Sequence, residues 1–304
     1  MKRVVITGAG TINALGHSVA ETFESMREGR CGIGELDFRD VDRLAIKIGG
    51  QVRDFEAEGR FNRQQMVLYD RFTQFTLVAA AEAIRQSGLE FTGDLAARSG
   101  VVLGTAGGGV STWDDNYRSV YEDGKNRVHP FVVPKLMNNA AASHVSMEYN
   151  LKGPSFTVST ACASSNHAMA QAFQMVRSGM SPAMVTGGSE SMLCFGGVKA
   201  WEGLRVMSRD ACRPFSKTRT GMVQGEGAAV GCANDEYLLA HPHLANAGQE
   251  PDGRRPILRL EDLPEGDLVG VGRRVVRVED VHVIRMGERR LHPILGQPAV
   301  LPPD

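Results

Sequence analysis

Apolar positions in the first 230 residues form two kinds of pattern that alternate along the chain. Short continuous apolar runs bounded by glycine or polar residues predict buried strands. These strands are Val4–Thr7, Gly100–Thr105, Ser155–Ser159, Ala183–Thr186 and the start of another at Glu226–Val230. Apolar residues at helical spacing predict helices over Val19–Arg27, Asp70–Gln86, Lys135–Tyr149 and the segment that follows Cys162. Alternating strands and helices indicate a layered α/β fold with a mainly parallel sheet.

Cys162 has the most informative position in this pattern, because it lies where a predicted strand turns into a helix. The helix side is apolar on nearly every face as far as Gly179, which predicts a helix buried in the core. Backbone N–H groups in the first turn of such a helix favour a thiolate and can hold an oxyanion. We therefore predict that Cys162 is a nucleophile, with an inert buried thiol as the alternative.

Three histidines are candidate bases for this thiol. His167 follows Cys162 by five residues, which is about 140° of rotation on a helix, so its imidazole is expected to point away from the thiol. His144 on the preceding predicted helix and His129 beside Pro130 have no stronger claim.

Gly8 and Gly10 directly follow the first predicted strand and suggest a dinucleotide-binding loop. That fingerprint needs a third glycine at position 13, which is Asn13. We therefore interpret these glycines as a tight turn from strand to loop.

Six segments of the chain resemble, in order, those of the β-ketoacyl-[acyl carrier protein] synthases, the condensing enzymes of fatty-acid and polyketide synthesis. They are VVITGAGTINALG (4–16), DRFTQFTLVAAAEAI (70–84), GVVLGTAGGGV (100–110), PFVVPKLMNNAAASHVSMEYNLKGPSFTVSTACAS (130–164), MVTGGSE (184–190) and RPFSKTRTGMVQGEGAAV (213–230). The phrases MSRDACRPF and GMVQGEGAA are similar to a subgroup that includes rhizobial nodulation-type synthases.

This resemblance implies a thiolase-like α-β-α-β-α layered sandwich of two similar halves, of which the chain would hold the N-terminal half and an incomplete second half. It implies that Cys162 accepts an acyl chain as a thioester, and that decarboxylation of a malonyl thioester then drives a Claisen condensation. No metal or redox cofactor is implied. The expected partners are acyl carrier protein, acyl and malonyl thioesters, and a second copy of the chain in a homodimer.

The resemblance also assigns residues around the site. Related synthases carry a bulky residue at the mouth of the acyl pocket where this chain has Gly107, followed by Gly108. A missing side chain there leaves room for a longer or more rigid acyl chain, and a flexible turn is the alternative. Lys135, Arg205 and Arg209 would supply a basic rim that attracts the acidic carrier protein.

The last part of the sequence departs from the family. The two histidine segments that complete the family's Cys-His-His site, H-G-T-x-T and N-x-x-F-G-F-G-G-x-N, do not occur. Residues 231–304 contain no Ser, Thr, Lys, Phe or Trp, and they hold eight of the 13 prolines. We therefore divide the chain into a β-ketoacyl synthase N-terminal domain at 1–230 and an atypical tail at 231–304. The tail is interpreted as frame-shifted or unrelated sequence, with a small native module as the alternative.

Composition and charge exclude several classes of protein function. A hydrophobic content of 42% over 304 residues suffices for a core. A net charge of −1 gives no excess of positive charge that would attract nucleic acid or an anionic membrane. No apolar run is long enough for a signal peptide or a membrane span. Five cysteines without a C-x-x-C pair argue against disulfides and zinc, so we expect a cytoplasmic protein in which the other four cysteines are inert.

Two further functions stay open beside the catalytic one. The chain could be a non-catalytic subunit that binds carrier protein or pairs with a complete synthase, although the presence of Cys162 argues against this. It could also be a gene remnant, because half of a two-half core leaves an apolar face uncovered. Without the two histidines, acylation of Cys162 remains possible but condensation is expected to be nearly lost.

Overall fold

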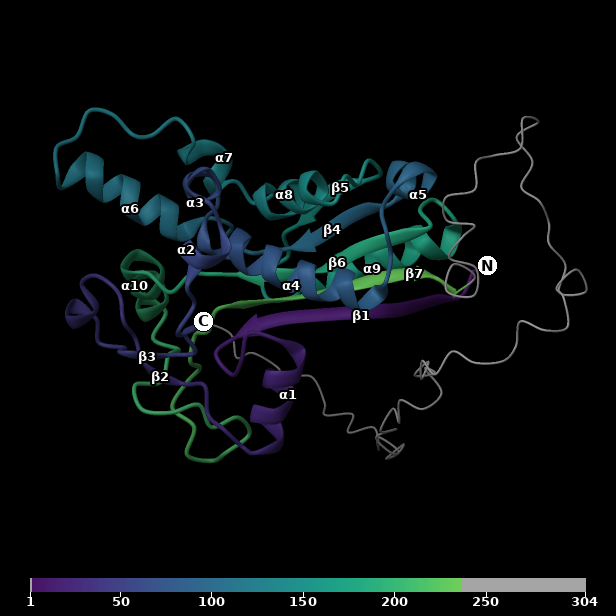
Figure 1. Cartoon of the computed structure of the whole chain (residues 1–304). Coiled ribbons are helices and arrows are strands. Elements are labelled where there is room, and N and C mark those ends of the chain that lie inside the picture. Colours follow the sequence, from purple (N-terminus) through teal and green to yellow (C-terminus); the bar gives the residue numbers. More distant parts are fainter. Residues whose placement is uncertain (1, 237–304) are drawn as a thin grey trace, which may run out of the picture. The chain divides into compact units, whose positions relative to one another are not determined.

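A computed structural model describes residues 2–236 of the chain and shows one five-stranded mixed sheet (Figure 1). The strands lie in the order β1-β7-β6-β4-β5. Their bounds are β1 Val4–Asn13, β4 Gly100–Gly104, β5 Ser155–Val158, β6 Ala183–Glu190 and β7 Gly227–Asp235. β4 is parallel to both β5 and β6, whereas β7 runs antiparallel to β6 and to β1. Within these residues the parallel part of the predicted sheet is thus β4, β5 and β6.

Helices cover both faces of the sheet, as the alternation of elements predicted. α4 (Arg71–Ser87) and α8 (Ala140–Glu148) pack on one face, and α9 (Ser164–Ser178) packs on the other. Successive side chains of a strand point to opposite faces. Val101 therefore belongs to the core under α4, while its neighbour Val102 belongs to the core under α9.

Further elements connect these layers, and of these the sequence pattern predicted α1. They are α1 Val19–Arg27, β2 Gly34–Glu35, β3 Ile48–Gly49, α2 Ala57–Arg60, α3 Arg63–Leu68, α5 Gly93–Arg98, α6 Val110–Tyr121, α7 Val132–Leu136 and α10 Phe195–Gly203. β2 and β3 form an antiparallel pair. A small second core lies beside them, formed by Leu36, Leu44, Ile46, Leu193, Val198 and Met207.

Two helix boundaries follow from capping residues that are visible in the sequence. The Asp70 side chain accepts a hydrogen bond from the backbone N–H of Phe72 and so caps the start of α4. Gly88 ends α4 in the left-handed conformation, with φ of 65°.

The helix predicted over Lys135–Tyr149 is divided into α7 and α8. The backbone N–H of Gly109 donates a hydrogen bond of 3.0 Å to the carbonyl of Leu136, which ends the first piece. The next residue, Met137, has an extended backbone, so the helix does not continue through it. A contact from a loop distant in sequence therefore overrides the local helical pattern.

The interpretation of Gly8 and Gly10 as a turn is wrong, because both lie inside β1. A Cβ at either position would overlap the backbone of α4, at Ala83 and Ala79 respectively. These glycines therefore let α4 lie directly on β1, with small residues facing small residues.

The sheet also extends past the boundary that we placed at residue 230. β7 continues through Asp235, where it pairs with Val4 of β1, and Ala233 pairs with Met184 of β6. Residues 231–235 are thus part of this sheet. The remainder of the predicted tail and the incomplete second half of the sandwich lie outside the described residues.

We predict that Gly10→Ala lowers the free energy of unfolding by about 1 to 3 kcal/mol, because the new Cβ forces α4 away from β1. The matched control is Gly231→Ala on β7, whose Cβ would meet its nearest neighbour at an ordinary 3.6 Å. Urea unfolding followed by circular dichroism measures both. Equal stability of the two variants would contradict this account of the packing.

Candidate functional site

Three parallel strands end at the same edge of the sheet, which we call the carboxyl edge (Figure 1). β4 ends at Gly104, β5 at Val158 and β6 at Glu190. The segments that follow them are therefore neighbours, and one of them carries Cys162. Ligand sites of α/β proteins lie at this edge, because loops from several strands converge there.

Cys162 lies on a tight turn between β5 and α9, formed by residues 160–164 and called the elbow below. Ala161 has a φ of 50°, which is an uncommon conformation for a residue with a side chain. The Ser164 hydroxyl closes the elbow by accepting a hydrogen bond from the Thr160 N–H at 2.8 Å and donating one to the Ala161 carbonyl at 2.7 Å. α9 begins at Ser164, so the exposed Cys162 lies just before the helix and not in its first turn as expected.

The elbow is held because α9 begins directly on the sheet. A Cβ at Gly104 would overlap the backbone of Ser164, and a Cβ at Gly188 would lie 2.7 Å from the Cβ of Ser165. Two strands without side chains at these points allow the helix start, and with it the elbow, to approach the sheet.

Our expectation that this helix is buried on all sides is wrong for the described residues. Only one face of α9 is buried, and it consists of Ser164, Ala168, Ala172 and Val176. Met169 and Phe173 on another face are 43% and 37% exposed. Small residues face the sheet, whereas Met169 and Phe173 lie on a face that residues 2–236 leave partly exposed, with the Arg177 guanidinium 5.5 Å from the centroid of the Phe173 ring.

Glu190 is a functional candidate that the sequence reasoning missed. Its carboxylate accepts hydrogen bonds from the Thr105 hydroxyl at 3.1 Å, the Ala106 N–H at 2.7 Å and the Gly107 N–H at 3.2 Å. Burial raises the pKa of this carboxyl. Glu190 thus fixes the segment after β4. It lies four residues beyond the strand predicted at Ala183–Thr186, so its place at the end of β6 was not visible in that pattern.

The two glycines predicted at the pocket mouth lie in this fixed segment but differ in their surroundings. Gly108 has a φ of 62° and packs against Asn138, so backbone conformation and space both favour glycine there. A Cβ at Gly107 would overlap the terminal methyl of Met192. The space beside Gly107 is therefore filled by a side chain from the segment after β6.

The remaining cysteines divide into two groups. Burial raises the pKa of the Cys194 thiol to about 11 and that of Cys232 to about 12. Cys31 and Cys212 are exposed, as Cys162 is. Exposure alone therefore does not single out Cys162, whereas its place on the elbow does.

None of the three candidate histidines hydrogen-bonds to Cys162 in the described part of the chain. His167 is exposed on α9. His144 lies edge-on against the Tyr69 ring at a centroid distance of 4.5 Å, and burial lowers its pKa. The His129 and Phe131 rings lie 5.2 Å apart between centroids, at an angle of 54°, in an exposed segment. These positions agree with the interpretation that the histidines do not act as the base.

The structure does not gather the three basic residues predicted to bind carrier protein on one element. Lys135 lies on α7 and lines a hollow of about 330 Å³ together with Asp115 and His129. Arg205 and Arg209 are exposed in the segment after α10.

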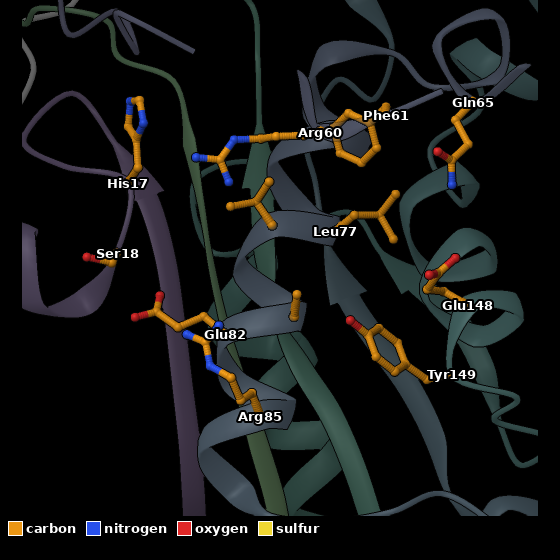
Figure 2. Close-up of a pocket in the computed structure, with 12 residues that line it drawn as sticks. His17, Ser18, Arg60, Phe61, Gln65, Leu77, Glu82, Arg85, Glu148 and Tyr149 are labelled. Atoms are coloured by element: carbon orange, nitrogen blue, oxygen red, sulfur yellow. The ribbon is translucent and has the colours of Figure 1, made fainter. Parts of the chain in front are cut away.

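A larger pocket, of about 400 Å³, lies where α4 and α8 meet the start of α1 (Figure 2). Its charged rim includes Glu82, whose carboxylate accepts hydrogen bonds from the N–H groups of Val19 and Thr11 and so ties α4 to β1. None of the predicted site residues lines this pocket.

Comparison with known proteins identifies the class. The model of the β-ketoacyl synthase N-terminal domain matches residues 1–232. Among solved structures, a β-ketoacyl synthase from Burkholderia phymatum STM815 has a TM-score of 0.70 at 28% identity, covering 80% of this chain and 61% of that one. The structure of the ishigamide ketosynthase/chain length factor has a TM-score of 0.73 at 24% identity, and the match covers 79% of this chain and 60% of that one. The fold is thus the thiolase-like fold of the ketosynthases, as the resemblance implied.

Curated relatives found by sequence indicate the same family. Nodulation protein E of Rhizobium leguminosarum bv. trifolii is 42% identical over 247 residues, which are 81% of this chain and 60% of that protein. The 3-oxoacyl-[acyl-carrier-protein] synthase 2 of Staphylococcus aureus (strain N315) is 34% identical over 234 residues, 75% of this chain and 56% of that one. The chain belongs to the β-ketoacyl synthase family, and it spans about 60% of the length of these relatives. No helix among residues 2–236 is long and apolar enough to cross a membrane.

We predict that Ala161→Gly raises the free energy of unfolding by about 1 kcal/mol, because glycine adopts the left-handed conformation without strain. The control is Ala163→Gly, two residues further on, where φ is −94° and glycine brings only its larger unfolded-state entropy. Thermal and urea unfolding of both variants test this. A loss of stability in Ala161→Gly as large as in the control would show that the elbow is not strained.

Proposed function

We propose that Cys162 accepts an acyl chain from a carrier thioester, as the first step of β-ketoacyl synthase chemistry. The Cys162 sulfur attacks the thioester carbonyl, a new carbon–sulfur bond forms, and the bond to the carrier sulfur breaks. The thiol proton of Cys162 ends on the departing carrier thiol, so the step needs no further reactant. The observation that carries the proposal is the elbow, which presents an exposed thiol ahead of α9 at the carboxyl edge of three parallel strands.

The leaving group of this reaction is the thiol of the carrier, so we propose an acyl carrier protein as partner. One structural neighbour, at 24% identity and a TM-score of 0.67, is described as a type II polyketide synthase acyl-carrier protein in complex with its ketosynthase. We assign the docking rim to Lys135, Arg205 and Arg209, which would attract an acidic carrier by charge.

The five free cysteines support a reducing, cytoplasmic location.

We also propose that the chain forms a homodimer through the side of the sheet that β5 occupies. Within residues 2–236, β5 pairs with β4 on one side and its other edge is unpaired. Unpaired edges favour pairing with another chain. Met147 on α8 is 66% exposed and Phe131, before α7, is 45% exposed, so a partner has apolar side chains to cover there.

A second candidate function is a non-catalytic subunit that binds a complete synthase. The exposed Met169 and Phe173 on α9 favour it, because they form an apolar face that a partner could cover. An intact cysteine elbow favours the catalytic assignment.

Incubation of the chain with an acyl carrier protein that bears an acyl group tests the proposal by intact-mass and peptide mass spectrometry. We expect one acyl adduct on Cys162 and none in Cys162→Ala. An adduct on Cys31 or Cys212 instead, or no adduct in folded protein, would contradict the proposal. The outcome also separates the catalytic function from the non-catalytic subunit, which needs no acylation.

A malonyl carrier protein in the same assay tests whether condensation is lost. The sequence lacks both family histidine motifs, and each missing oxyanion donor costs on the order of 3 kcal/mol. Two such losses amount to a rate reduction of roughly 10⁴ or more. We therefore expect no measurable release of CO₂ beyond that of Cys162→Ala, and release at the rate of a complete synthase would contradict this prediction.

A further inference from the structure

The pocket beside α4 is separate from the elbow and has no part in the proposed function (Figure 2). None of its lining residues belongs to the elbow or to the segments after β4 and β6. Its volume of about 400 Å³ lies in the range of pockets that hold small molecules. The lining comes from the loop before α1, from α2, α3 and α4, and from the end of α8.

The floor of this pocket is one face of α4. Leu77, Ala81 and Arg85 follow one another at intervals of one turn, so the floor changes from apolar to cationic over about 12 Å. Ala81 is exposed, and its single methyl group adds the least bulk to this face. Figure 2 shows Phe61 and Tyr149 on the same side of α4 as Leu77, which makes that half of the pocket apolar.

The other half of the pocket, toward His17, carries two cations without an acidic partner. Neither Arg60 nor Arg85 forms a salt bridge or a side-chain hydrogen bond with any residue between positions 2 and 236. The Arg60 guanidinium lies 5.8 Å from the centroid of the Phe55 ring. Both arginines are exposed at the rim, so their long side chains can turn toward one bound group.

The acids of the lining leave these cations available. Glu82 Oε1 accepts a hydrogen bond from the Val19 N–H at 2.9 Å, and Oε2 accepts one from the Thr11 N–H at 3.0 Å. Both oxygens are thus used within the fold. Glu148 lies on the opposite side of α4 from Glu82 (Figure 2). The charge toward His17 that lacks a partner is therefore positive.

We propose that this pocket binds a small amphipathic anion, with an aromatic or short aliphatic body and a phosphate or carboxylate head group. Arg60 and Arg85 hold the head group, because guanidinium groups bind both kinds of oxyanion through paired N–H donors. The body crosses α4 over Ala81 and rests against Phe61 and Tyr149. The proposal goes beyond the proposed function, because this site uses neither Cys162 nor a carrier protein.

The probe is 1-naphthyl phosphate, which has an aromatic body and one anionic head group. Equilibrium dialysis against the full chain measures its Kd, and we expect one site with a Kd on the order of 1 mM or below for a ligand of this size. Two partial probes, 1-naphthol without the charge and inorganic phosphate without the body, are expected to bind at least about tenfold more weakly. Comparison with 1-naphthoate shows whether phosphate or carboxylate is the preferred head group.

Variants place the probe in the pocket. Ala81→Leu fills the crossing point without a change of charge, and the double variant Arg60→Gln/Arg85→Gln removes both head-group donors. Each is expected to raise the Kd about tenfold or more. The matched controls are Ala97→Leu, at an exposed position of α5, and Arg63→Gln, at an exposed position of α3. Neither control residue lines the pocket, so the Kd is expected to stay unchanged.

The proposal would be overturned by the absence of saturable binding below roughly 10 mM, or by equally tight binding of 1-naphthol. An unchanged Kd in folded Ala81→Leu would also overturn it, and this variant decides alone if the double variant does not fold. Phe173→Ala reduces the exposed apolar face of α9, where an aromatic probe could otherwise bind. Binding lost in Phe173→Ala but kept in Ala81→Leu would place the probe on α9 and contradict the proposal.

Discussion

The direct contact between the start of α9 and the sheet is the constraint on which the site depends. Gly104 and Gly188 leave no side chain between the strands and the backbone of Ser164 and Ser165. With the helix start fixed there, the Ser164 hydroxyl can hold both Thr160 and Ala161. The left-handed Ala161 and the exposed thiol of Cys162 follow from that closure, so packing energy in the core supports a strained turn at the surface.

Two carboxylates, the half-buried Glu190 and the buried Glu226, fix the segments around this contact. Glu190 holds the segment after β4, next to the elbow. Glu226, just before β7, accepts hydrogen bonds from Arg71 Nε on one carboxylate oxygen and from Arg71 Nη2 on the other. It also accepts hydrogen bonds from the Val52 N–H and the Ser191 hydroxyl. Removal of one partner of a buried ion pair typically costs about 3 to 5 kcal/mol. Glu226 is therefore structural, because it joins three segments that are distant in the chain.

Local patterns predicted the parts of the fold that depend on local chemistry. The long helix predicted over Asp70–Gln86 is α4, displaced by one residue at each end, and Cys162 does lie between a strand and a helix. Contacts between distant segments were not visible in the sequence. Gly8 and Gly10 resemble a turn until α4 is known to lie on them, and the pairing of Gly107 with Met192 depends on two loops that only the parallel sheet brings together. The exposed face of α9 shows the same limit, because a helix's apolar pattern does not say which segment covers it.

The reactivity of all five cysteines, measured in native protein and again in urea, tests most directly whether the fold activates Cys162. Iodoacetamide labelling followed by peptide mass spectrometry gives each rate constant. The account predicts that native Cys162 reacts fastest, ahead of Cys31 and Cys212, which are exposed as well. The half-buried Cys194 and the buried Cys232, whose thiol pKa values are raised, are expected to stay unlabelled. In urea the five rates are expected to converge. If native Cys162 reacts no faster than Cys31 and Cys212, or keeps its advantage in urea, the elbow does not create the nucleophile.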